Sequence, residues 1–431
     1  MVRHSNPTKE GLLVKKHSSI VSLIVALIAI AVVPNVYGSE RITFLTPLWN
    51  DRVQAWYENE AIPAFEARYP DLDVSIEYTD WNGMRERIAV GIAAGVGADV
   101  IVTTGEGSAR SQGDEGILRP LDSYLQEWDG LEDTLPFALE VQRLDGRTYA
   151  VPNTVNLRAY ATNVDLMERA GYLADAPIGE WGDWVRQVQR LSGAYNYQDI
   201  AAFRANGGQY VEGVFAEADL TWLDDNLRLS LQSPDARAIL THLDNVFQAS
   251  GGLTAGATPE IFRQAGQFVT ASVAVGWIAL ANIINAEREL GPGSIAIPDP
   301  AREIAIMPAT GLGITTVSQN PDAAWRWIEF LSERENLIRF NDFYGRIPPR
   351  MSAIQSSPAM LESPLFARAA DVAARFGRPT PFSNRYGSLA DIRNQAANIV
   401  NAMFRGEMHP DQVAQEIEIL WNSRLPDQAA K

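Results

Sequence analysis

Apolar positions between residues 42 and 102 change their spacing along the chain, from short continuous runs to a repeat of about four residues. Short apolar or alternating runs are typical of strands, and a repeat near 3.6 residues is typical of an amphipathic helix. The strand pattern occurs in three segments: Ile42–Leu45, Val74–Tyr78 and Val100–Val102. The helix pattern occurs between them, over 52–68 and in a stretch where Met84, Ile88 and Ile92 recur. This β-α-β-α-β order predicts an α/β fold with a mostly parallel sheet and helices on both faces.

Proline and glycine mark where these elements should bend or end. Pro63 falls inside 52–68 and, because it lacks a backbone N–H, should kink or split that helix. Gly95 and Gly97 should end the helix that contains Ile92. Asn320-Pro321 predicts a helix start, with Asn at the cap and Pro at the first helical position.

The rest of the chain continues to alternate between helical and extended patterns. Further helices are predicted at 181–191, 236–247, 389–404 and 410–421. Further strands are predicted at Ser272–Trp277, Ile304–Met307 and Gly311–Val317. The chain has no internal repeat and no low-complexity linker, which suggests domains joined by several short crossings.

The first 38 residues have the pattern of a secretory signal peptide. Four basic residues precede the apolar run Ile20–Val33, and small residues stand before Ser39. A run of about 14 residues is shorter than the roughly 20 needed to span a bilayer. We therefore expect cleavage after residue 38 and export to the periplasm; the alternative is an uncleaved membrane anchor.

Charge and cysteine content narrow the partners of the exported chain. The whole chain has 36 basic and 53 acidic residues, of which four basic and one acidic lie in residues 1–38. The rest of the chain therefore has 32 basic and 52 acidic residues, a net charge of −20. So acidic a surface disfavours binding to nucleic acid. The chain has no cysteine, so no lipid can be attached at the cleavage site and disulfides cannot stabilise the protein. A freely soluble protein with two large cores is the expected result.

Catalytic and metal-binding patterns are weak. Beyond residue 38 the chain has only His242 and His409, each placed where a structural role is expected, and no cofactor or metal site is predicted. Gly311-Leu312-Gly313 lacks the third glycine of a dinucleotide fingerprint. A glycosidase needs a pair of carboxylates, and nothing in the sequence marks one.

Tryptophans stand at the ends of predicted strands. Trp49 follows the first strand, Trp81 follows the second, and Trp277 should end Ser272–Trp277. Ligands of open α/β sheets bind beyond the carboxyl ends of the strands, and an indole offers a flat apolar face to a sugar ring. Polar residues expected nearby could bind the sugar hydroxyls: Asn50, Glu106, Asn153 and Asn156.

Several motifs, in their order along the chain, resemble the extracellular solute-binding proteins of ABC importers. The resemblance is to the carbohydrate class, which is maltose-binding-protein-like. The matching segments are Phe65–Pro70, Gly97–Val100, Gly116–Asp122, Asp145–Pro152, Tyr160–Gly171, Val275–Trp277 and Gly345–Arg350. Each motif alone is short, but their shared order spans nearly the whole chain after residue 38.

The resemblance implies a two-lobed periplasmic-binding-protein fold of type II, with a mixed, mostly parallel sheet in each lobe. Residues 39–152 and 310–348 would form lobe one, and residues 153–309 and 349–431 lobe two. The chain would cross between the lobes three times, near Pro152–Thr154, Pro308–Gly311 and Ile347–Arg350. Ligand would bind in the cleft between lobes that close like a hinge.

Eleven residues are expected at the ligand, nine carried over from the resemblance and two, Asn153 and Gly311, from their positions beside the predicted crossings. They are Trp49, Asn50, Trp81, Glu106, Asn153, Asn156, Tyr210, Trp277, Gly311, Arg346 and Tyr386. Asn156 stands where some members have a carboxylate, so the ligand need not be that of maltose-binding protein.

The implied function is to capture a carbohydrate and deliver it to an inner-membrane ABC permease, as a monomer and without catalysis. Within the same fold, a glycerol phosphate or phosphodiester is an alternative ligand, for which Arg346 or Arg385 would be needed. An organic cation is another, favoured by clustered aromatic residues. The alternative from another class is a secreted glycoside hydrolase, which would need paired carboxylates about 5–10 Å apart.

Overall fold

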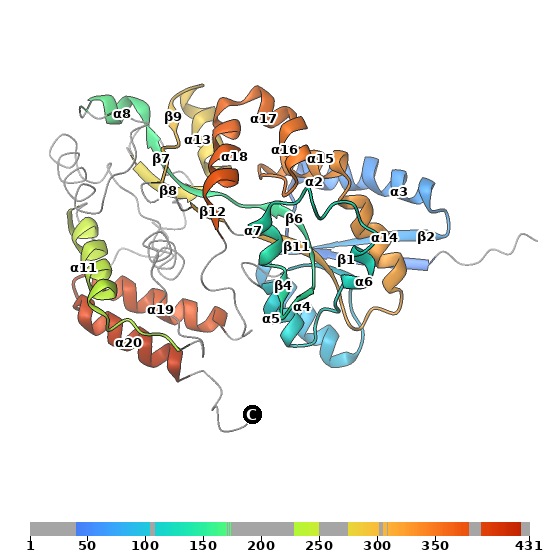
Figure 1. The fold of residues 1–431 in the computed structure, drawn as a ribbon, viewed down its shortest axis with the longest axis horizontal. Helices are drawn as coiled ribbons and strands as arrows, with labels where there is room; N and C mark the ends of the chain where they lie inside the picture. The colour runs from blue at the N-terminus through green and yellow to red at the C-terminus, as the bar shows by residue number, and fades with distance from the viewer. Residues whose placement is uncertain are drawn as a thin grey trace, which may run out of the picture.

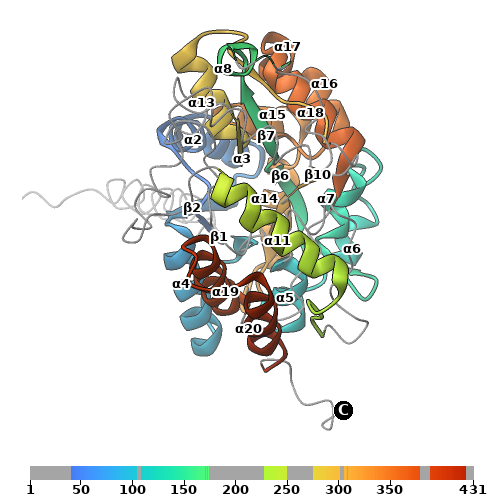
Figure 2. The same ribbon diagram turned by 90° about the vertical axis from the view of Figure 1, so that its left-hand side faces the viewer.

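The computed structural model describes residues 40–103, 108–169, 171, 173, 228–249, 275–300, 305–307, 309–378 and 389–423. Two sheets lie on opposite sides of a central region where the chain passes between them several times (Figures 1 and 2). The helix predicted at 181–191 lies outside the described residues.

The larger sheet has the strand order β2-β1-β3-β11-β6. Its strands are β1 (Glu40–Thr46), β2 (Leu72–Tyr78), β3 (Val100–Val102), β11 (Ala309–Ile314) and β6 (Val151–Val155). The first three are parallel, which confirms the β-α-β-α-β prediction. β11 runs antiparallel to both β3 and β6, so the sheet is mixed.

The helix after β1 changes its hydrogen-bond pattern just before Pro63 but is not split there. The helix runs as α2 (Asp51–Trp56), a π-helical segment η1 (Tyr57–Ala61) and α3 (Ile62–Arg68). The N–H of Ile62 donates to the carbonyl of Tyr57, five residues earlier, immediately before the proline. Proline cannot donate to the preceding turn, and the wider π turn lets the helix continue without that bond.

The core beside this helix is built around a fully buried indole. Trp327 of α14 (Pro321–Leu331) has no exposed surface. Its ring centroid lies 5.0 Å from that of Phe65, at an interplanar angle of 80°, and 6.4 Å from that of Phe44 in β1. Edge-to-face packing of this kind is favourable beyond the area it buries. α14 begins at Pro321 as predicted, although the Asn320 side chain makes no capping hydrogen bond.

The other face of the sheet is covered by α4 (Trp81–Ala94), which buries Met84 and Ile88. It ends at Gly95 in the left-handed region, with φ of 69°, a conformation that costs glycine little. Shorter helices complete the half of the molecule that contains this sheet: α5 (Ser108–Asp114), α6 (Asp122–Leu125), α7 (Pro136–Glu140) and α15 (Arg334–Tyr344), the last of which packs against α2. A small hairpin joins β4 (Arg143–Leu144) and β5 (Arg147–Thr148).

The second sheet has β7 (Arg158–Asn163) at its centre. β8 (Val275–Ala279) and β9 (Ile295–Ala296) pair with it, both antiparallel. The described part of this sheet is therefore antiparallel and not mostly parallel as expected, because strand direction is set by partners distant in the sequence. β7 begins only three residues after β6 ends, so the first passage between the sheets is short. Next to this sheet lie β10 (Ala305–Ile306), β12 (Gly377–Arg378) and helices α8 (Val164–Arg169), α13 (Leu280–Leu290), α16 (Met351–Ser356), α17 (Pro358–Glu362) and α18 (Pro364–Phe376).

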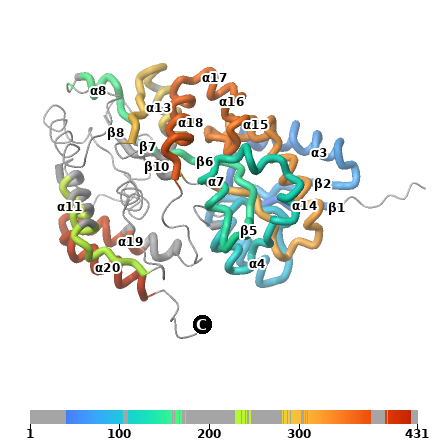
Figure 3. The backbone as a smooth tube through the Cα atoms, viewed as in Figure 1, coloured from blue at the N-terminus to red at the C-terminus, as the bar shows by residue number. Residues whose placement is uncertain are grey.

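Three helices pack together at the far end of this second half (Figure 3). They are α11 (Pro234–Ala249), α19 (Leu389–Phe404) and α20 (Pro410–Asn422), close to the predicted 236–247, 389–404 and 410–421. The His409 side chain accepts a hydrogen bond from the N–H of Asp411 and caps α20. That contact fits the structural role expected for His409.

A charged cluster fixes the segment that leads into α16. Arg350 Nε donates to Asp133 Oδ2 at 2.9 Å, and the N–H of Ser352 donates to Asp133 Oδ1 at 2.9 Å. Burial alone would raise the pKa of Asp133. Hydrogen bonds from the side chain and backbone of Ser352, and from Arg350, outweigh burial and hold that pKa below its ordinary value of 3.8.

The Asp133 cluster predicts a pH-dependent stability. A carboxyl whose pKa is lowered by folding stabilises the protein above its unfolded-state pKa, and this contribution is lost as the pH falls through the lowered value. Asp133→Asn should reduce the free energy of unfolding by about 2 kcal/mol at pH 7, the scale of hydrogen bonds to a charged group. The difference from the unsubstituted protein should shrink below pH 3.8. Urea unfolding between pH 7 and pH 3 measures it.

Asp73→Asn is the matched control, because Asp73 pairs with Arg41 at an exposed position. Exposed ion pairs contribute about 0–1 kcal/mol, so this variant should unfold almost as the unsubstituted protein does. A loss at Asp133 that does not change with pH would contradict the prediction.

Candidate functional site

The carboxyl ends of three parallel strands meet at one edge of the larger sheet, and two predicted site segments begin there. Trp49 and Asn50 follow β1, and Trp81 follows β2. Because β1 lies between β2 and β3, this edge also receives the segment after β3. Glu106 belongs to that segment but lies outside the described residues.

Trp49 presents an indole face at this edge. Its side chain is 40% exposed, and its Nε1–H donates to the carbonyl of Thr79 at 2.9 Å. Its ring centroid lies 5.7 Å from that of Tyr78. Since the only polar atom of the indole is occupied by Thr79, Trp49 has an apolar ring surface to offer a ligand.

Tyr78 supports Trp49 and is absent from the residues predicted from sequence. Its hydroxyl oxygen is buried and makes no hydrogen bond with the residues described. Burial, followed by the nearby Glu58 carboxylate, raises the pKa of Tyr78, so the phenol stays neutral. The available signal was an aromatic residue at the last position of a strand whose following segment contains Trp81.

Asn50 is committed to internal hydrogen bonds. Its Oδ1 accepts from the N–H groups of Arg52 and Val53 and so caps α2. Its Nδ2 donates to the carbonyl of Phe343 at 3.1 Å, near the end of α15. The side chain therefore fixes the segment after β1 to a helix almost 300 residues later in the sequence.

Trp81 is the first residue of α4, where Asp80 caps the helix by accepting from the N–H of Gly83 at 2.7 Å. Trp81 is half-buried and packs against the core of the larger sheet. Its position is thus fixed by both the cap and the core.

Gly311 and Asn153 lie where β3, β11 and β6 come together. The N–H of Gly311 donates to Thr103 Oγ1 at 2.9 Å, and its carbonyl accepts from the N–H of Thr103. A Cβ at Gly311 would lie 2.8 Å from Ala150 Cβ and 2.9 Å from the carbonyl oxygen of Val151. Only glycine allows this approach of the strands. Asn153 Oδ1 accepts from Thr310 Oγ1 at 2.9 Å.

Asn156 and Arg346 come from distant parts of the sequence to adjacent positions. Val155 and Ile347 form an antiparallel bridge, which places their neighbours Asn156 and Arg346 opposite each other. The Arg346 guanidinium lies 5.2 Å from the ring centroid of Tyr344. Asn156 Oδ1 is buried and accepts no hydrogen bond from the described residues.

The second sheet contains Trp277, at a different place in its strand than expected. β8 continues to Ala279, so Trp277 lies in the middle of the strand, paired with Tyr160, and not at its end. Ile278 and Ala279 extend the strand because they pair with Ala159 and Arg158 of β7. Tyr210 and Tyr386 lie outside the described residues.

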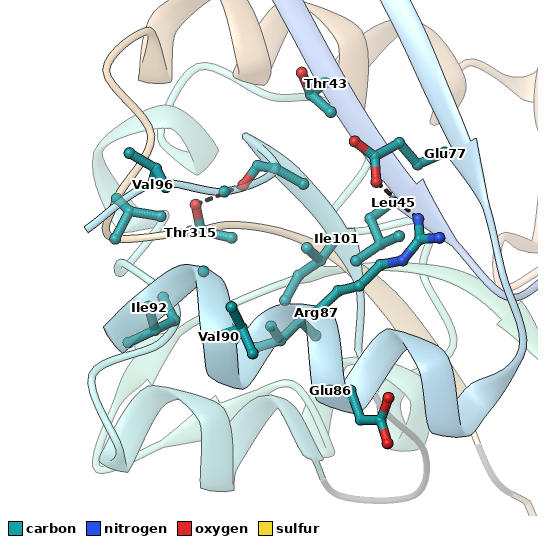
Figure 4. A pocket seen from close by; sticks show the side chains of 15 residues that line it. Thr43, Leu45, Glu77, Glu86, Arg87, Val90, Ile92, Val96, Ile101 and Thr315 are labelled. Atoms are coloured by element: carbon teal, nitrogen blue, oxygen red, sulfur yellow. Dashed lines mark hydrogen bonds and ion pairs between the residues drawn. The ribbon is translucent and has the colours of Figure 1, made fainter. Parts of the chain in front are cut away.

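A pocket of about 530 Å³ lies elsewhere, between α4 and the sheet (Figure 4). It is lined by later residues of α4, such as Val90 and Ile92, and by Leu45 and Ile101 of the sheet. None of the predicted site residues lines it. Its walls are mostly apolar and its Arg87 is paired with Glu77 at 2.8 Å, so it has few free polar groups for a sugar.

Two negative findings concern the described part of the chain. No group of His, Cys, Asp or Glu side chains there could hold a metal ion. No helix there is long and apolar enough to cross a membrane.

Comparison with protein families decides the class of this chain. The model for the family described as bacterial extracellular solute-binding protein matches residues 50–337. The chain belongs to this family. A Brucella abortus (strain 2308) protein named as a binding protein is 24% identical over 379 residues, which cover 84% of this chain and 87% of that protein.

Solved structures show that this solute-binding protein has the two-lobed fold. The sugar-binding protein MalE from Xanthomonas citri has a TM-score of 0.73 at 20% identity, over 89% of this chain and 98% of that one. The GacH receptor of Streptomyces glaucescens, determined unliganded and with acarbose, has a TM-score of 0.73 at 17% identity, over 90% and 99%. A Thermotoga lettingae ABC transporter solute-binding protein bound with α-D-tagatose has a TM-score of 0.72 at 17% identity, over 90% and 100%.

The contacts of Asn50 predict that its substitution changes stability. Asn50→Ala removes the cap of α2 and should lower the free energy of unfolding by about 1 kcal/mol. Asn50→Ser keeps a capping oxygen and loses the bond to the Phe343 carbonyl without placing a charge beside it, so it should cost less. Chemical unfolding measures both. An unchanged midpoint for Asn50→Ala would contradict the structural role.

Proposed function

We propose that this solute-binding protein captures a neutral carbohydrate between its lobes and delivers it to an inner-membrane ABC permease. The observation that carries the proposal is the pair of tryptophans, Trp49 and Trp81, that follow adjacent strand ends at one sheet edge. An indole face stacks on the C–H surface of a sugar ring. Three proteins of the same fold support the ligand class, since they are named for sugar binding or were determined with acarbose or tagatose.

The lobes in this proposal follow the boundaries expected from the sequence. Lobe one comprises residues 39–152 and 310–348, and lobe two comprises 153–309 and 349–431. The crossing segments near Pro152, Gly311 and Ile347 are hydrogen-bonded neighbours, through the pairing of β6 with β11 and the Val155–Ile347 bridge. Adjacent crossings of this kind act as a hinge, and closure encloses the ligand.

The site combines stacking surfaces with a small number of polar groups. Trp81 and the exposed face of Trp49 supply the stacking surfaces. Asn156 and Arg346 lie beside the hinge and supply polar groups. Trp277, Glu106, Tyr210 and Tyr386 complete the proposed contacts. Asn50 and Gly311 act chiefly by shaping the site, because their polar groups are bound internally. The side-chain oxygen of Asn153 is likewise bound to Thr310.

Residues 1–38 direct export in this proposal, and the mature protein acts in the periplasm as a soluble monomer without a lipid anchor. No bond in the ligand is broken. Incubation with oligosaccharides should therefore give calorimetric binding without product, and product formation would support the hydrolase instead.

A thermal-shift screen identifies the ligand class, because a ligand that binds only the folded state raises the melting temperature. The screen covers mono-, di- and trisaccharides, polyol phosphates and betaines. We expect the shift with a neutral sugar. A shift with polyol phosphates alone would contradict the neutral-sugar proposal and favour a role for Arg346 in binding phosphate.

The Trp277 contact has its own test. Trp277→Ala and Trp81→Ala should each weaken binding of the identified sugar about tenfold or more, since losing one large apolar contact costs roughly 1–3 kcal/mol. Trp325→Ala is the control, because Trp325 stacks on Tyr124 within the larger-sheet half, at 5.1 Å between ring centroids. Isothermal titration calorimetry measures all three. Unchanged affinity in Trp277→Ala would remove that residue from the site.

A further inference from the structure

One chain of hydrogen bonds connects all three crossing segments. Asn341 Nδ2 donates to the carbonyl of Asn153 in the first crossing at 3.0 Å. Asn153 Oδ1 accepts from Thr310 Oγ1 of the second crossing at 2.9 Å. The carbonyl of Asn341 accepts from the N–H of Arg346, at 3.0 Å, where the third crossing begins.

Asn341 occupies a position where a hydrophobic residue would normally be expected. It lies on α15, is 0% exposed, and its neighbours Leu337 and Phe340 are buried core residues. Its Nδ2 also donates to the carbonyl of Leu337 at 2.8 Å, whereas its Oδ1 is buried without a partner among the described residues. A buried amide with an unused acceptor costs free energy that a leucine would not.

The crossing region has other features expected of a hinge that must accommodate more than one arrangement of the lobes. Thr154 Oγ1 and Gln142 Oε1 are buried without partners in the described part of the chain. The register of β6 against β11 shifts between Thr310 and Gly311, and such irregularities bend a strand. These residues surround the crossings, where the relative rotation of the lobes must be absorbed.

We propose that Asn341 is a positioning residue that sets the balance between the arrangements of the two lobes. Its side chain links α15 of lobe one to the first crossing through the hydrogen bond to the Asn153 carbonyl. Asn153 in turn accepts a hydrogen bond from Thr310 of the second crossing. The unused acceptors allow these groups to exchange partners when the lobes rotate. The inference rests on the closing motion in the proposed function, and it is independent of which ligand is bound.

The experiment measures the distance between the lobes in the ligand-free protein. Since the chain has no cysteine, Val90→Cys on α4 and Ile419→Cys on α20 can be spin-labelled without competing thiols. These side chains are 69% and 55% exposed. Pulsed electron spin resonance then gives the distribution of lobe-to-lobe distances.

Asn341→Leu should shift the ratio of distance populations about fivefold to tenfold, as expected for the loss of one buried hydrogen bond. Thr310→Val, which removes only the hydroxyl that donates to Asn153, should shift it in the same direction by less. If Asn341→Leu does not fold, Thr310→Val alone decides: a shift supports the proposal and an unchanged distribution overturns it.

Asn336→Leu is the matched control on the same helix, because Asn336 Nδ2 donates to the carbonyl of Phe330 within lobe one. It should lower the melting temperature and leave the distances unchanged. The proposal is overturned if Asn341→Leu behaves like this control. No ligand is present, so a protein that binds no sugar would still show the shift, and failure of the proposed function is distinguished from failure of this inference.

Discussion

The pairing of β11 with both β3 and β6 is the interaction on which the rest of the molecule depends. β11 comes from residues 309–314, yet it lies between a strand from residues 100–102 and one from residues 151–155. By pairing with both strands, β11 joins β6 to the parallel part of the larger sheet and brings the crossing segments together. It requires a residue without a side chain at Gly311, where a Cβ would meet Ala150 and Val151. The pairing of β11 with β3 and β6 therefore positions both the candidate site at the strand ends and the crossing segments around Asn341.

Local patterns in the sequence predicted the elements that depend on local physics. Residue spacing, caps and prolines predicted the parallel strands β1, β2 and β3, a disturbance of the helix at Pro63, and the helices α11, α14, α19 and α20. The prediction that β8 ends at Trp277 was wrong, because Ile278 and Ala279 continue the strand through their pairing with β7. The antiparallel direction of β11 likewise depends on strands more than 150 residues away.

The composition of the candidate site was harder to predict than its location. Strand ends predicted where Trp49 and Trp81 lie, since the carboxyl edge of a parallel sheet follows from topology. Their contact with a ligand stays a prediction. Residue type alone could not show that the Asn50 amide nitrogen donates to the Phe343 carbonyl, or that the Asn153 side-chain oxygen accepts from Thr310. Tyr78 was missed for a related reason: an aromatic residue at the end of a strand has the same local signal whether it fills the core or supports a site.

Under the proposed function, the hydrogen bond from Trp49 to the Thr79 carbonyl has a consequence for how the protein distinguishes sugars. An indole whose N–H is already occupied has no directional bond to give, so it accepts any ring with an apolar face. Stereochemical selection among sugars must then come from groups that can still form directional bonds to hydroxyls. A protein built this way can change its preferred sugar by altering a few polar side chains while the aromatic surface stays the same.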